Sequence, residues 1–170
     1  MRKIIVVNKK DEIIGTKEFD AIESKDIYRI SALWIINSKN EVLIAQRALS
    51  KKIDPGKWGP SVAGTLDEGE AYESNIVKEA EEEIGLKLED FKKGPKIKVI
   101  VESVGRQFFC QSYIAKLDKK ISDFTIQKDE VEKIQWIPIK ELILDIKNNP
   151  EKYTASMRYI ESHYGIMKML

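Results

Sequence analysis

Short runs of hydrophobic residues, most of them β-branched or aromatic, recur along the chain and are separated by polar turns. Such runs predict β-strands, and the NSKN tetrapeptide at residues 37–40 predicts a hairpin turn between two of them. The predicted strands are Lys3–Val7, Ile13–Lys17, Arg29–Ile36, Glu41–Arg47, Trp58–Gly64, Lys96–Ser103, Arg106–Leu117 and Glu130–Trp136. The first two form a hairpin extension over about residues 1–25, and its end at Phe19–Lys25 fits either a helical turn or a loop. Gly94-Pro95 is expected to break the chain before the strand that starts at Lys96.

Helical spacing of hydrophobic residues predicts three helices, the first from about Ala71 to Ile84. A step of about 100° per residue places four residues of this helix on one apolar stripe. They are Ile76, Val77, Ala80 and Ile84. Pro138 opens a short second helix, which ends at residues 148–150. A final helix from about Glu151 would dock on the sheet through Tyr153, Met157, Ile160, Tyr164 and Met167.

The order of these elements predicts an α+β fold, because strand pairs surround one central helix and further helices follow late in the chain. The 170 residues are enough for one domain with a substantial core, and no repeat, linker or low-complexity tract divides them. We therefore expect a single domain over residues 1–170, with the N-terminal hairpin as an extension of it. The sequence leaves the oligomeric state open.

Composition and charge narrow the classes of function. Lys and Arg number 29 against 28 Asp and Glu, so no basic field indicates a nucleic-acid polymer as partner. The hydrophobic fraction of 42% is typical of a globular chain, and no hydrophobic run approaches the roughly 20 residues of a membrane span. The single cysteine, Cys110, forms no internal disulfide, and the N-terminus lacks the apolar segment of a signal peptide. These features predict a cytoplasmic protein without membrane contact.

Acidic residues gather on the first predicted helix, next to its apolar stripe. Glu79, Glu82 and Glu83 are spaced i, i+3 and i+4, which places like charges about 5–6 Å apart on one face. A hard divalent cation such as Mg²⁺ would relieve this repulsion, because it prefers oxygen ligands. A solvated acidic face is the commoner meaning of such a pattern, so the flanking residues decide between the two interpretations.

The segment Gly64–Leu86 resembles the signature of the Nudix hydrolases. That signature is a glycine, five residues, a glutamate, seven residues and then REUXEEXGU, where U is a bulky apolar residue. The matching positions are Gly64, Glu70, Glu79, Glu82, Glu83, Gly85 and Leu86. Two positions depart from it, since Lys78 replaces the arginine and Ala80 is small for a U position. The resemblance extends in outline from about Ile30 to Leu142 and implies the Nudix fold, a mixed β-sheet between α-helices.

The resemblance also implies a metal-dependent hydrolase that cleaves a diphosphate bond in a nucleoside diphosphate derivative or a similar small molecule. Glu79, Glu82 and Glu83 would hold Mg²⁺, or Mn²⁺ in its place, with the backbone carbonyl of Ala63 as a further ligand. The cation would neutralise the charge of the diphosphate and activate water. The motif positions with a structural role would be Gly64, Glu70, Lys78 and Gly85.

Lys78 is the position where the chain differs most from the signature. In the family, Glu70 helps to tie the motif loop to the basic residue at this position. An arginine can contact Glu70 and a helix glutamate at once, because its planar fork has several donors. Lysine is a point charge on a flexible stem, and we expect it to neutralise only one acid and to leave a looser loop.

Two positions compete for the role of general base. One is Glu79, and the other is an acid just before the last strand, Glu130 or Glu132, although either fits an exposed charge at a strand start equally well. Arg47, at the end of a strand, resembles the arginine that many family members direct at phosphate, and its fork can bind two phosphate oxygens. A solvent-facing strand arginine is equally compatible with that position. Weaker candidates for phosphate binding are Arg29 and Arg106.

Two other functions fit parts of the sequence. The spacing between Arg47 and the WGPSVAG strand resembles the Nudix branch that contains isopentenyl diphosphate isomerase, which uses a cysteine in this strand and a histidine-rich metal site. Here the strand has Ser61 and no cysteine, and the only histidine is His163. The second alternative is a catalytically silent binding module, against which the three retained acids argue. The sequence does not name the substrate, because loops such as 48–57 and 117–129 would select it.

Overall fold

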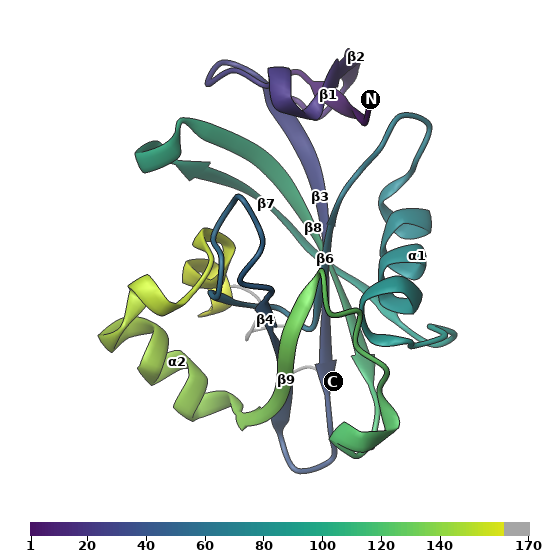
Figure 1. Ribbon diagram of the computed structural model, residues 1–170, viewed down its shortest axis with the longest axis vertical. Helices are drawn as coiled ribbons and strands as arrows, with labels where there is room; N and C mark the ends of the chain where they lie inside the picture. Colours follow the sequence, from purple (N-terminus) through teal and green to yellow (C-terminus); the bar gives the residue numbers. More distant parts are fainter. Residues whose placement is uncertain (162–170) are drawn as a thin grey trace.

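The computed structural model describes residues 1–161, which form a mixed nine-stranded β-sheet with a helix on each face (Figure 1). The strands are β1 Lys3–Val7, β2 Ile13–Glu18, β3 Ile27–Ile36, β4 Glu41–Arg47, β5 Trp58–Gly59, β6 Val62–Thr65, β7 Lys92–Val101, β8 Arg106–Lys116 and β9 Val131–Pro138. The α-helices are α1 Tyr72–Ile84 and α2 Ile139–Asn148. The predicted α+β class, with a mixed sheet between helices, is confirmed.

The long strand β3 lies at the centre of the sheet. It pairs antiparallel with β1, β4 and β6 and parallel with β8. Its side chains alternate between two buried faces. Leu33 and Ile35 pack in one core with α1, whereas Trp34 and Ile36 pack in a second core with α2. Because both faces are covered, this stretch is continuously hydrophobic instead of alternating.

The first helix matches its predicted bounds and its predicted buried face. Its residues Ile76, Ala80 and Ile84 are fully buried. It ends at Gly85, whose φ of 65° lies in the left-handed region and whose N–H donates to the carbonyls of Ala80 and Glu81. A Cβ atom on Gly85 would also approach Thr125 to 2.9 Å, so both backbone conformation and space require glycine there.

Three local predictions are wrong. The strand predicted at Trp58–Gly64 is divided into β5 and β6, and Pro60 lies between them. Gly94-Pro95 does not break the chain, because β7 continues through it with a register shift between Lys93 and Lys96. The first part of the predicted final helix, residues 151–159, instead contains two 3₁₀ turns, Pro150–Lys152 and Ala155–Tyr159, and helical backbone starts only at Ile160. Tyr153, Met157 and Ile160 still pack against α2, whereas Tyr164 and Met167 lie outside the described residues.

The N-terminal extension joins the main sheet. β1 pairs with β2 and also with β3, and its residues Ile4–Val7 are buried. The segment after β2, for which the sequence fits either a helical turn or a loop, contains a 3₁₀ turn at Phe19–Ala21. Within residues 1–161, no helix is both long enough and apolar enough to cross a membrane.

Candidate active site

Two adjoining cavities lie where the end of β6 and helix α1 face the loop between β4 and β5. The charged cavity has a volume of about 560 Å³ and contains the acids of α1. The apolar cavity has a volume of about 170 Å³ and continues away from α1 toward the β7–β8 hairpin. Seven residues belong to both walls: Phe19, Arg47, Ile53, Ala63, Thr65, Glu83 and Glu130. A ligand can therefore occupy both cavities at once.

The charged cavity brings together the predicted metal-binding acids. Glu79, Glu82 and Glu83 of α1 line it with Glu130, which directly precedes β9. The basic residues in its wall are Arg2, Arg47, Lys51, Lys52 and Lys78. Within residues 1–161, no group of three acidic, histidine or cysteine side chains converges tightly enough to form a metal site in itself. The acids thus share one cavity without meeting at one point.

The electrostatics of these acids fit a cation. Burial raises the pKa of Glu79, against the opposing effect of Lys78. Burial together with the charges of Glu79 and Glu130 raises the pKa of Glu83 to about 8, although a hydrogen bond from the Ala63 backbone N–H opposes the rise. The group therefore carries more negative charge than its surroundings favour. All its donors are hard oxygens, so the residues fit the divalent metal that the resemblance implies.

Lys78 ties together the loop and the helix. Its Nζ lies 2.6 Å from Glu70 Oε1, 3.4 Å from Glu79 Oε1 and 4.0 Å from Asp67 Oδ2. The contact implied between Glu70 and Lys78 is present. Lys78 still supplies a single positive charge, but its ammonium group contacts three carboxylates, because it lies between the loop and the first turns of α1.

A buried asparagine also connects the motif loop to α1, and the sequence analysis did not identify it. Asn75 is fully buried, accepts a hydrogen bond from Ser31 and donates to Glu70 Oε2 at 2.8 Å. The same Glu70 oxygen accepts the backbone N–H of Asp67 at 2.9 Å. Burial would raise the pKa of Glu70, but Lys78, Asp67 and Asn75 outweigh it and hold that pKa below its ordinary value. The available signal was a polar residue next to the apolar stripe of the helix.

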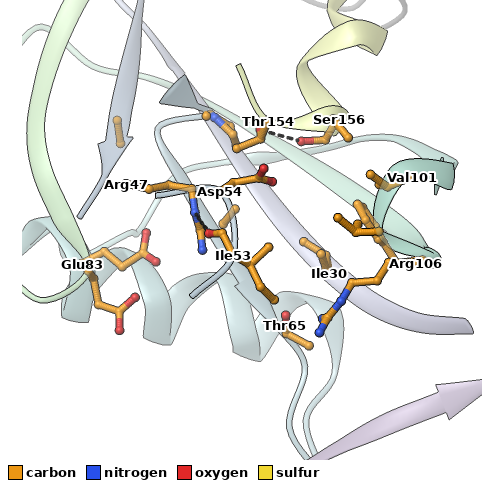
Figure 2. A pocket seen from close by; sticks show the side chains of 18 of the residues that line it. Ile30, Arg47, Ile53, Asp54, Thr65, Glu83, Val101, Arg106, Thr154 and Ser156 are labelled. Carbon is orange, nitrogen blue, oxygen red and sulfur yellow. Dashed lines mark hydrogen bonds between the residues drawn. The ribbon is translucent and has the colours of Figure 1, made fainter. Parts of the chain in front are cut away.

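Arg47 and Glu130 lie at the junction of the two cavities, but Glu132 does not. Arg47 Nε donates to the Ile53 carbonyl at 3.0 Å, and its guanidinium faces the shared space with Glu83 (Figure 2). Glu130 forms an ion pair of 2.5 Å with Lys51. Glu132 is exposed and lines neither cavity, so its candidacy as general base is wrong. The candidate bases are Glu79 and Glu130.

The candidacy of Arg29 for phosphate binding is also wrong. Arg29 Nε donates to Asp11 Oδ1 at 2.7 Å, and Lys96 and the Tyr72 hydroxyl bind the same carboxylate. Burial would raise the pKa of Asp11, but these cations outweigh it and lower that pKa. Arg29 therefore attaches the N-terminal extension to β3 and lines neither cavity.

Beyond the wall that it shares with the charged cavity, the apolar cavity is built from parts of the chain that lie outside the motif. Its hydrophobic wall includes Phe19 from the extension, Tyr28 from β3, Val101 and Phe108 from the β7–β8 hairpin, and Ala155 after α2. Of the two loops expected to select a substrate, loop 48–57 contributes Ile53 and Asp54, and loop 117–129 lines only the charged cavity through Gln127 and Asp129. These segments are far apart in sequence and adjacent only in the fold.

Cys110 takes no part in either cavity. It lies in β8 with 1% of its surface exposed, and burial raises the pKa of its thiol to about 12. A thiol in these surroundings is unreactive at neutral pH. His163 lies outside the described residues.

Comparisons with known proteins agree with this geometry. A family model described as NUDIX domain matches residues 27–159. A prenyl-diphosphate phosphatase from Methanosarcina mazei is 30% identical over 158 residues, which cover 89% of this chain and 88% of that protein. An isopentenyl-diphosphate Delta-isomerase from Enterobacter sp. (strain 638) is 25% identical over 163 residues, which cover 91% and 86%. The crystal structure of DR0079 from Deinococcus radiodurans superposes with a TM-score of 0.74 at 20% identity, over 86% of this chain and 90% of that one.

Proposed function

This chain belongs to the NUDIX domain family, and from that premise we propose that it is a Mg²⁺-dependent hydrolase of diphosphates that carry a short apolar group. In the proposed reaction, the oxygen of a water molecule bonds to one phosphorus and the P–O–P bridge breaks. The products are an alkyl monophosphate and orthophosphate. The observation that carries the proposal is the junction of a charged cavity with an apolar one, through seven shared wall residues.

The two cavities match the two halves of such a substrate. A diphosphate needs cations around it, and the charged cavity offers Arg47, Lys51 and Lys52 together with the acids for a metal. The apolar half gains free energy when it leaves water. At about 0.8 kcal/mol per buried carbon, a five-carbon group would gain roughly 4 kcal/mol, which is close to a thousandfold in affinity.

Each polar residue has an assigned role in this proposal. Glu79, Glu82 and Glu83 would hold Mg²⁺ or Mn²⁺, which supplies charge neutralisation at the diphosphate when it is bound. Arg47 binds a phosphate through the part of its fork that faces the shared space. Glu130, in the wall common to both cavities, accepts the proton of the attacking water, and Glu79 is the alternative base.

The relatives support an apolar substrate. The Methanosarcina protein is named for prenyl diphosphates, and the Enterobacter protein is named for isopentenyl diphosphate. Both names describe a diphosphate attached to a hydrocarbon group, although the two reactions differ. The alignments cover 89% and 91% of this chain, so they include most of the residues that line the apolar cavity.

Isomerisation is the second candidate function, because several relatives are isomerases. The isomerase branch uses a cysteine in the strand before the motif. The one cysteine of this chain is buried and lines neither cavity. Ala63 and Thr65, which cannot act as a thiol or an imidazole, occupy the β6 wall. Hydrolysis needs neither group, so we favour it.

The test is a substrate panel with Mg²⁺, in which released orthophosphate and the organic product are both identified. The panel contains dimethylallyl diphosphate, geranyl diphosphate, a nucleoside diphosphate sugar and inorganic pyrophosphate. We expect the alkyl diphosphates to be hydrolysed with the highest kcat/KM, and a chelator to abolish the activity until Mg²⁺ or Mn²⁺ is restored. Formation of an isomeric diphosphate would favour the isomerase, and binding without turnover would favour a silent module. Preference for the nucleotide sugar would contradict the apolar substrate.

A further inference from the structure

Arg106 lies in the wall of the apolar cavity, where a cation is least expected. It is the first residue of β8, and its side chain extends into the cavity with the guanidinium pointing toward Thr65 (Figure 2). Thr65 belongs to the wall that both cavities share. The charge of Arg106 is therefore directed from the apolar side toward the junction, while Arg47 lies on the other side of the same space (Figure 2).

Aromatic residues hold this guanidinium in place. Its Cζ lies 5.2 Å from the centre of the Phe19 ring, and the group interacts with the Tyr28 hydroxyl. Phe19 lines both cavities, so the guanidinium lies over a surface that continues into the charged cavity. An aromatic face orients a guanidinium but does not neutralise it. The donors that do not bind Tyr28 remain available for an anion.

In the wall of the apolar cavity, two of the carboxylates form ion pairs, but the two arginines do not. Asp54 pairs with Lys57 at 2.8 Å, and Glu130 pairs with Lys51 at 2.5 Å. Arg47 and Arg106, in contrast, make no direct ion pair with a carboxylate of residues 1–161, although Arg47 is attracted at longer range to the carboxylate of Glu83. A cation in a partly apolar wall that contacts no carboxylate directly is costly unless an anion binds beside it. Two such cations, on opposite sides of one space, suit a ligand with two anionic groups.

We propose that Arg106 binds the phosphate that carries the apolar group, and that it keeps this contact in the alkyl monophosphate product. The proposal rests on the hydrolase function above. Arg106 lines the apolar cavity and not the charged one, whereas Lys51 and Lys52 line only the charged one. A substrate whose hydrocarbon part fills the apolar cavity places its inner phosphate nearest Arg106 and its outer phosphate nearest the lysines. Arg106 thereby distinguishes the two phosphates, and the outer one leaves as orthophosphate.

Product binding tests this assignment directly, because the two products separate the two phosphates. Titration calorimetry would measure the affinity of dimethylallyl monophosphate and of orthophosphate for the wild type, Arg106→Gln, Arg106→Lys and a control, Lys93→Gln. Lys93 is an exposed cation of the same hairpin and lines neither cavity. Circular dichroism would verify that each variant is folded, and Arg106→Lys keeps the charge if the glutamine variant does not fold.

We expect Arg106→Gln to weaken dimethylallyl monophosphate about 10-fold or more, since a charge-assisted hydrogen bond is lost, and to change orthophosphate affinity less than twofold. Arg106→Lys should lie between it and the wild type, and the KM for dimethylallyl diphosphate should rise in parallel. An equal loss for both products, or a glutamine variant that behaves like Lys93→Gln, would overturn the assignment while hydrolysis by the wild type continued. Failure of the wild type to hydrolyse any alkyl diphosphate would instead overturn the proposed function, and this assignment with it.

Discussion

A Cβ atom on Gly64 would lie 2.4 Å from Cγ of Glu79, so the glycine of β6 and the glutamate of α1 share a space that admits no further atom. The carboxylate of Glu79 lies against the strand at this point, and its side chain is only 13% exposed. The first glycine of the motif is therefore required by the position of a glutamate fifteen residues later. The backbone of Gly64 needs no unusual φ, so close approach is the whole reason.

Gly64→Ala should displace Glu79 and lower both stability and turnover. Overpacking of this kind costs about 1–3 kcal/mol, which corresponds to roughly 2–4 °C in Tm for each kcal/mol in a chain of this size. Thermal unfolding with a steady-state assay would measure both effects. Gly59→Ala is the control for stability, because its Cβ would meet Thr154 at an ordinary 3.6 Å. An alanine variant as stable and active as the wild type would contradict the contact.

Glu83→Gln keeps the size of the side chain and removes one charge from the crowded acids. Turnover with Mg²⁺ should fall by about 100-fold or more, because even the residues behind metal ligands contribute 10–100-fold. The metal-free protein should become slightly more stable, since burial and two neighbouring carboxylates disfavour the ionised form. The control is Glu81→Gln, an exposed acid of the same helix that lines neither cavity. Unchanged turnover and metal affinity would assign Glu83 to a solvated acidic face.

Lys78→Ala removes the ammonium group that contacts Glu70 and Glu79. The two carboxylates are left without their shared cation, so Tm and turnover should both fall, and Lys78→Arg should keep or raise both. Differential scanning fluorimetry and the phosphate-release assay would measure this, with the exposed Lys87→Ala as control. If the alanine variant matched Lys87→Ala in both measurements, Lys78 would be an ordinary surface lysine.

Asp11→Asn tests the network that attaches the N-terminal extension. Asp11 is buried with φ of 62°, a conformation that asparagine also adopts, so the change removes charge and leaves the backbone unstrained. Loss of the buried partner of Arg29 should cost about 3 kcal/mol at neutral pH. Because the pKa of Asp11 is lowered from 3.8, the stabilisation is complete above pH 3.8 and is lost as pH falls through the folded pKa.

Urea unfolding at several pH values would measure this dependence. The difference between the wild type and Asp11→Asn should be constant at pH 5 and pH 7 and should narrow below about pH 3.8. Asp20→Asn, at an exposed acid of the same extension, should show no such difference. A gap that stayed the same at low pH would rule out the charge of Asp11 as its source.

Ala155→Leu should reduce the space of the apolar cavity, whose volume is only about 170 Å³. We expect kcat/KM for dimethylallyl diphosphate to fall about 10-fold and that for geranyl diphosphate to fall further, because each lost methylene of space costs 1–3 kcal/mol. Steady-state kinetics would measure both, with orthophosphate affinity as the control for the charged cavity. Equal kinetics for the variant and the wild type would place the hydrocarbon group elsewhere.

The sequence by itself determined the features that depend on near neighbours in the chain. The α+β class, the bounds of α1, its buried face, and the gathering of Glu79, Glu82 and Glu83 follow from helical and strand periods, which act over a few residues. The wrong predictions also reflect the short range of these patterns. The segment from Glu151 was predicted to be helical because Tyr153, Met157 and Ile160 have helical spacing, but over residues 151–159 two 3₁₀ turns satisfy the packing against α2 equally well.

Only the tertiary structure decided which residues meet across the sheet. Arg29 and Arg106 each begin a predicted strand, so the sequence does not distinguish them. In the structure, Asp11 of the extension neutralises Arg29, whereas Arg106 faces the apolar cavity. Glu130 and Glu132 are two residues apart, yet only Glu130 lines the cavities, since the chain enters β9 directly after it. Such outcomes depend on strand pairing and register between segments that are distant in the chain, and no local pattern specifies them.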